Sequence, residues 1–125
     1  MKYQILQIRV TDAEVDLINE TGDFNAVPKF AAKRDLDFAE MKGTTIEVLA
    51  KEYFDKGYYT HVANIEGSDL EHVFQISNLG NEEDRVERLD RMHSLSVGDL
   101  VIDGNDIVWV VANFGFEEVC ELEAA

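Results

Sequence analysis

Three histidines and one cysteine are the residues of this chain that most readily ligate a metal ion. His61, His72 and His93 do not have the spacing of a zinc site, and Cys120 lies far along the chain. His61 and Cys120 would meet only if the fold brought them together, and nothing in the local sequence requires that. We therefore predict structural or surface histidines and no metal site.

A serine pair beside His93 is the arrangement that most resembles a nucleophile with its base. Ser94 and Ser96 lie within three residues of that histidine. Side chains so close along the chain rarely point at each other, because catalytic triads are assembled in space. The chain has no G-x-S-x-G, no C-x-x-C and no glycine-rich phosphate loop. We predict no catalytic residue and no cofactor, so an enzyme is the least favoured function.

Acidic side chains dominate the chemistry of the chain. It has 26 Asp and Glu against 11 Lys and Arg, which gives a net charge of −15. Nucleic acids and anionic membranes need a positive surface, so the charge argues against both and favours a basic partner. Asp99, Asp103 and Asp106 do not have the spacing of a calcium-binding loop.

Length and composition indicate one globular domain, 1–125, in a reducing compartment. The hydrophobic fraction is 46%, and the one cysteine leaves no internal disulfide. The first ten residues alternate and include Gln and Arg, which is not typical of a signal peptide. No apolar stretch approaches the roughly 20 residues of a membrane span. The expected location is cytoplasmic.

The elements that must position these residues are those of an α+β fold with a mostly antiparallel sheet. Alternating or continuous apolar runs predict strands over 3–10, 58–66, 97–103 and 107–112. Thr11 with Glu14, and Ser68 with Glu71, predict capping boxes that begin helices over 12–21 and 69–78. Asp-Gly and Asn between the last two strands predict a hairpin turn with positive φ.

The middle of the chain is harder to assign. Apolar residues from Ile46 to Phe54 predict a helix over about 44–56 that ends at Gly57. The segment 30–41 fits helical spacing poorly and alternates through Leu36, Phe38 and Glu40, so we favour an edge strand there. Residues 81–91 are dense in charge, and acid-first pairs at i,i+4 predict a short helix or an ordered loop.

The same patterns predict which side chains form the core. The predicted core residues are Leu6, Ile8, Val15, Ile18, Leu49, Phe54, Val62, Ile65, Leu70, Val73, Phe74, Val101, Val108, Val110 and Phe116. Aromatic residues that proved to be exposed would lie beside acids and could anchor an interface.

Three segments of the second half carry a resemblance to a known group. They are 92–102 with S-L-S-V-G-D, the strand around Trp109, and G-F-E-E at 115–118, together with D-L-E-H-V-F at 69–74. Over about 58–119 the chain resembles small proteins of tailed phages and mobile elements, the YodL-like group. The resemblance implies an accessory protein in a bacterial host and says almost nothing about chemistry.

The favoured function is therefore binding of a basic host protein, and mimicry of a nucleic acid is the most specific version of this hypothesis. The stretches 57–84 and 92–125 contain no Lys or Arg and are expected to be sheet neighbours. Their outward carboxylates would form one negative face. The predicted face consists of Glu66, Asp69, Glu71, Asp99, Asp103, Asp106, Glu117 and Glu118. The alternatives are acidity that serves only solubility, and a structural homodimer.

Overall fold

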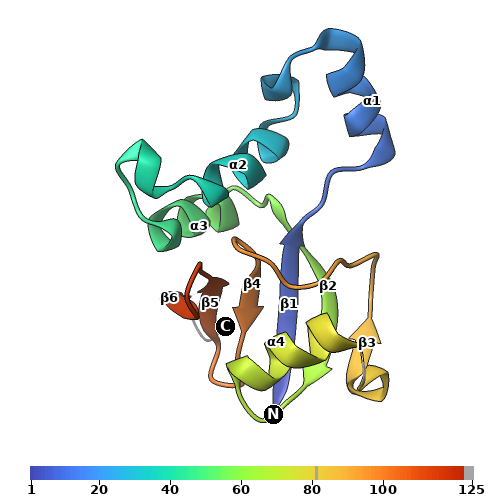
Figure 1. The fold of residues 1–125 in the computed structure, drawn as a ribbon, viewed down its shortest axis with the longest axis vertical. Coiled ribbons are helices and arrows are strands. Elements are labelled where there is room, and N and C mark those ends of the chain that lie inside the picture. The colour runs from blue at the N-terminus through green and yellow to red at the C-terminus, as the bar shows by residue number, and fades with distance from the viewer. Residues whose placement is uncertain (81, 123–125) are drawn as a thin grey trace.

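A six-stranded sheet, antiparallel throughout, forms the centre of the fold (Figure 1). The computed structural model describes residues 1–80 and 82–122, apart from the side chain of Phe24. The strand order across the sheet is β3-β2-β1-β4-β5-β6. The strands are β1 (Lys2–Ile8), β2 (Tyr59–Glu66), β3 (Val86–Arg88), β4 (Leu100–Ile102), β5 (Ile107–Val111) and β6 (Phe116–Glu121). The predicted α+β class is confirmed.

Helices cover both faces of the sheet. On one face α4 (Leu70–Leu79) packs Val73 and Ile76 against Ile5, Ile65 and Val101. On the other face α2 (Pro28–Asp37) and α3 (Ile46–Asp55) pack against a second cluster that includes Leu100, Val108 and Val110. Central strands with two buried faces explain the nearly continuous apolar runs of the sequence. Within the described residues, no helix has the length and apolar character needed to cross a membrane.

Helix α1 (Asp12–Thr21) lies apart from the sheet, beyond α2 (Figure 1). The predicted capping box is present, since Thr11 Oγ1 accepts from Glu14 N and Glu14 Oε1 accepts from Thr11 N. Of its apolar residues only Ile18 is buried, while Val15 is 40% exposed. The prediction of Val15 as a core residue was wrong because this helix packs on neighbouring helical turns, not on the sheet.

The prediction of an edge strand over 30–41 was also wrong. Pro28 occupies the first turn of α2, where its missing N–H leaves no bond unmade. Ala32 and Leu36, one helical turn apart, are the buried positions of the helix. The 3-10 turns η1 (Phe24–Ala26) and η2 (Glu40–Lys42) flank it. Exposed Phe38, which suggested alternation, lies just beyond the helix end.

Helix α4 begins one residue later than its predicted capping box requires. Asp69 is the N-cap, and its Oδ1 accepts from His72 N at 2.8 Å. Ser68 instead donates its backbone N–H to the His72 ring. The helix itself is confirmed, whereas the capping box of Ser68 and Glu71 was wrong, because the carboxylate one position along caps the helix instead.

The acidic segment after α4 forms a short 3-10 turn, η3 (Glu83–Arg85), and then β3. Arg88 pairs with Glu83 instead of with the acid four residues before it. In the β4–β5 turn, Asp106 has the positive φ of 62°, so the expectation that Gly104 or Asn105 would have it was wrong. Of the predicted core, only Val15 and Phe74 are exposed.

Candidate functional site

Three exposed large apolar side chains, including the two most exposed ones among the described residues, open onto one groove of about 390 Å³. Phe114 in the β5–β6 turn is 96% exposed, Met41 of η2 is 84% exposed, and Phe38 is 50% exposed. All three line the groove, together with the backbone between α2 and α3. Exposed aromatic residues next to one another are typical of protein-binding surfaces.

Every charged residue that lines this groove is acidic. These residues are Asp37, Glu40, Glu47 and Glu117. Within the described chain none of the four forms an ion pair. Burial raises the pKa of the Asp37 carboxyl, and the nearby Lys33 only partly opposes that effect. The groove therefore offers apolar contacts and carboxylates that form no ion pair with a described residue.

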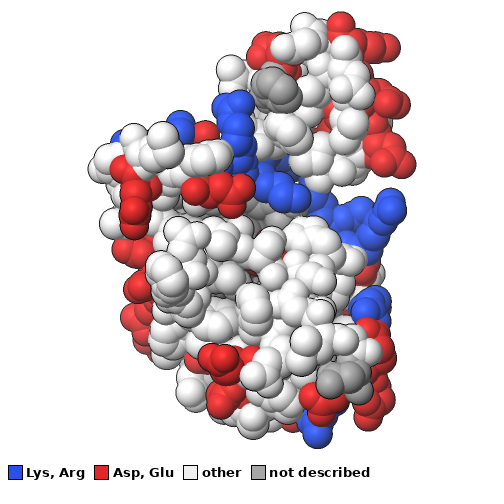
Figure 2. Space-filling view, in the orientation of Figure 1, with Lys and Arg blue, Asp and Glu red and all other residues white. Residues whose placement is uncertain are grey.

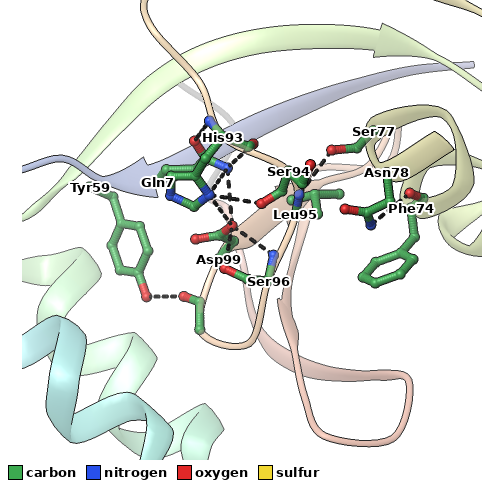
Figure 3. A network of polar contacts seen from close by, with 11 residues as sticks. Gln7, Tyr59, Phe74, Ser77, Asn78, His93, Ser94, Leu95, Ser96 and Asp99 are labelled. Carbon is green, nitrogen blue, oxygen red and sulfur yellow. Dashed lines mark hydrogen bonds and ion pairs between the residues drawn. The ribbon is translucent and has the colours of Figure 1, made fainter. Parts of the chain in front are cut away.

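A buried polar network forms a second feature, where the 92–99 segment crosses β1 (Figure 3). Gln7 is fully buried, and its Nε2 donates to Asp99 Oδ2 at 3.0 Å and to the His93 carbonyl at 2.9 Å. Ser96 N donates to the same Asp99 oxygen at 3.0 Å. Tyr59 Oη donates to the Gly98 carbonyl at 2.6 Å. These bonds fix the 92–99 segment to the central strands.

Burial raises the pKa of Asp99 to about 6, against the bonds from Ser96 and Gln7 and the charges of His93 and Lys33. Such a carboxylate beside a histidine is a recognised signal of a functional site. However, Asp99 is only 4% exposed, and its Oδ2 accepts from two residues that anchor a loop. This geometry explains the network as a structural clamp.

The predicted negative face is divided by the structure. Asp99 is buried, so its inclusion in a partner-binding face was wrong: its acceptor atoms serve the clamp. Glu66, Asp69 and Asp103 all lie near Tyr3, whose pKa is raised mainly by burial and further by these three carboxylates. Asp106 lies in the same turn as Asp103, and Glu71 lies in the first turn of α4. For these five residues, partner binding stays a prediction.

The last two residues of the predicted face separate within β6. Glu117 is opposite Val110 and Glu118 is opposite Trp109, so their side chains leave opposite faces of the sheet. Only Glu117 lines the groove with Phe114. The sequence could not place Phe38 and Met41 there, because the segment that carries them was predicted as a strand.

The three histidines have separate partners. His61 contacts Asn64 Oδ1 at 2.8 Å, His72 contacts Glu82 Oε2 at 3.1 Å, and His93 Nδ1 lies 2.8 Å from the Ser94 carbonyl. Among the described residues, no group of three His, Cys, Asp or Glu side chains is arranged to hold a metal ion.

Comparison of the chain with protein-family models, with curated proteins and with solved structures found no match. The resemblance to proteins of phages and mobile elements therefore stays a prediction.

Proposed function

We propose that this protein binds a basic segment of another protein in the groove lined by Phe38, Met41 and Phe114. The observation that carries the proposal is the pairing of exposed apolar side chains with four carboxylates that form no ion pair with any residue the structure describes. An amphipathic segment with Lys or Arg beside apolar residues satisfies both properties at once.

The groove combines apolar and acidic side chains, which favours recognition of an amphipathic protein segment over mimicry of a nucleic acid. A mimic of a duplex needs carboxylates at the density of phosphates, about one charge per 1.7 Å of axis. Phe114 and Met41 interrupt such a line with apolar surface. If the resemblance to mobile-element proteins holds, the partner is a bacterial host protein.

Strand pairing between two copies is disfavoured. The edge strand β6 carries Glu117, Glu118 and Glu121, so antiparallel pairing with itself would oppose like charges. The other edge strand, β3, has three residues. The segment 30–41, which was predicted to be an edge strand, is mainly helical.

The test uses a synthetic amphipathic helix of Lys and Leu, with a matched peptide of Glu and Leu. We expect saturable binding of the Lys peptide only, with shifts of the Asn113 and Phe114 amide signals in NMR. Phe114→Ala and Glu117→Lys should each weaken binding by roughly tenfold, as expected for central contacts. Higher salt should slow association.

Two variants outside the groove provide matched controls. Leu79 is 68% exposed at the end of α4, and Glu20 is exposed on α1. Leu79→Ala and Glu20→Lys should change affinity less than about twofold. Equal losses in the groove and control variants would mean that the peptide responds to overall charge, and the groove would not be the binding site.

A further inference from the structure

A second cleft, of about 420 Å³, lies where β1 leads into α1. Its lining has the opposite charge to the rest of the molecule, with Arg9, Lys33, Arg91 and the ring of His93. Asp12 is the one carboxylate among its described lining residues. Figure 2 shows Lys and Arg side chains gathered between the helical part and the sheet.

Two of these cations have no ion-pair partner in a chain with a large excess of acids. Lys33 and Arg91 form none within the described residues, whereas every other Lys and Arg except Lys2 does. Lys33 does lie near Asp37 and Asp99, since its charge acts to lower the pKa of both, but it forms an ion pair with neither. The chance of a nearby carboxylate is high at 26 acids to 11 bases. Unpaired cations that converge on one cleft therefore indicate a site for an anion that is not part of the chain.

The remaining lining residues indicate the chemistry of the part of the ligand that the cations do not contact. Ile8, Val10 and Met92 supply an apolar wall beside the cations. Arg9 is held by Asp90, through its Nη1 at 2.5 Å, which fixes its position and leaves its other N–H groups for a ligand. Small ligands bind in clefts of this size with mostly apolar walls and a few placed polar groups.

His93 completes the cleft in a fixed orientation. Gln7 holds the His93 backbone through both its amide atoms, at 2.9 and 3.2 Å. The contacts of the ring to described residues are made by Nδ1, with the Ser94 carbonyl at 2.8 Å, the Gln7 amide at 3.3 Å and Asp99 Oδ2 at 3.8 Å. Nε2 is therefore available to a ligand. The buried network thus supports one wall of the cleft.

We propose that this cleft binds a small organic phosphate, with the phosphoryl group at Arg9, Lys33 and Arg91 and the organic part against Ile8, Val10 and Met92. These three cations outnumber the lining carboxylate Asp12, although Asp90 already pairs with Arg9. Arg pairs phosphate oxygens bidentately. A long polyanion is disfavoured because the net charge of −15 repels it beyond the cleft. A small anion is affected mainly by charges within a Debye length, about 8 Å.

The test is a titration of the protein with phenyl phosphate, followed by NMR of the backbone amides. Inorganic phosphate, benzoate and a single-stranded oligonucleotide are titrated in parallel. We expect saturable shifts at residues 9–11 and 91–93, with phenyl phosphate tighter than inorganic phosphate and benzoate. Lys33→Gln and Arg91→Gln should each weaken binding roughly fivefold, and the spectra of the variants report whether they fold.

Lys56→Gln is the matched control, because it removes the same charge from an ion pair of α3. It should change affinity by less than about twofold. Tighter binding of benzoate would overturn the phosphate assignment, and tighter binding of the oligonucleotide would show a nucleic-acid surface instead. Absence of saturation, or an equal loss in Lys56→Gln, would overturn the site. None of these outcomes depends on the groove around Phe114.

Discussion

The Asp99 carboxylate joins parts of the chain that are far apart in sequence. It accepts from Gln7 of β1 and from Ser96 of the preceding loop, while Val111 N donates to the Asp99 carbonyl. A buried ionised group is costly unless its acceptor sites are filled. Because Gln7 has no charge, the hydrogen bonds reduce the free-energy cost of burying the Asp99 carboxylate but do not remove that cost.

The position of this carboxylate predicts a pH dependence of stability with a definite sign. Burial raises the pKa of Asp99 to about 6, above the value of an unfolded aspartate. The folded state then binds more protons between the two values, so its stability falls as pH rises from about 4 to 6. Asp99→Asn removes this term, so the variant should gain on the wild type by roughly 3 kcal/mol as pH rises through that window. Urea unfolding of both proteins at several pH values measures it.

Asp103→Asn gives the opposite sign and serves as the control. Burial opposes ionisation of Asp103, but hydrogen bonds from the Trp109 indole and from Ile107 and Asn105 outweigh it and lower its pKa. The wild type should therefore lose its advantage over Asp103→Asn as pH falls below about 4. A difference curve for Asp99→Asn that is flat, or that slopes like this one, would refute the assignment.

The role of Gln7 could not be predicted from the sequence. In an alternating strand it occupies a position that usually faces solvent, and both faces are covered here because the 92–99 segment crosses over β1. Asp99 was predicted to be an outward carboxylate, because the local sequence does not show that the 92–99 segment is buried against β1. What was visible locally, such as the capping box of Thr11 and Glu14, was predicted correctly because its partners are three residues apart.

At the scale of elements, helix α4 provides a sharp test of which residue is the cap. Asp69 Oδ1 accepts from His72 N, whereas Ser68 interacts with the His72 ring. Asp69→Ala should therefore destabilise the protein by about 1 kcal/mol, and Ser68→Ala by clearly less. Thermal or urea unfolding compares them. The reverse order would restore the capping box of Ser68 and Glu71.

The two turn glycines of the C-terminal motif differ in their surroundings. Gly98 has φ +95°, and an added Cβ would lie 3.1 Å from Leu36 Cβ. Gly115 has φ +78° with nothing within 4 Å. Gly115→Ala should cost about 1 kcal/mol from backbone strain alone, and Gly98→Ala about 3 kcal/mol because it also displaces α2. Equal losses of unfolding free energy would show that Leu36 does not constrain this turn.

The error over 30–41 shows where local pattern reading reached its limit. Ala31, Ala32, Lys33 and Arg34 are good helix formers, and Pro28 favours a helix start. The short alternation through Phe38 outweighed those signals, although Phe38 is exposed beyond the helix. Because η2 and the start of α3 follow, this one error also hid the groove. Tertiary contacts at Ala32 and Leu36 decided the conformation.

At the scale of the whole molecule, ion pairs are unevenly distributed among the charged side chains. Most Lys and Arg side chains form ion pairs with acids. The groove acids Glu40, Glu47 and Glu117 form none with the residues that the structure describes. In a chain of net charge −15 these unpaired carboxylates add to the repulsion that opposes folding. Their removal should stabilise the free protein.

The corresponding variant changes Glu40, Glu47 and Glu117 to Gln together. At low salt its Tm should exceed that of the wild type by roughly 3–5 °C, because self-repulsion falls while no ion pair is lost. The gain should shrink as salt screens the remaining charges. The same variant should bind the Lys and Leu peptide more weakly, so stability and binding would change in opposite directions.

A second triple variant, at Glu52, Asp55 and Glu83, removes the same number of charges from acids that form ion pairs with Lys56, Lys51 and Arg88. It relieves the same average repulsion but also breaks attractive pairs, so its Tm at low salt should rise less than that of the groove variant. It should leave peptide binding unchanged.

Thermal unfolding followed by circular dichroism, at low and high salt, compares the two triple variants. An equal rise in both variants would show that only total charge matters. The unpaired acids of the groove would then serve only solubility, and the electrostatic part of the proposed binding function would be refuted.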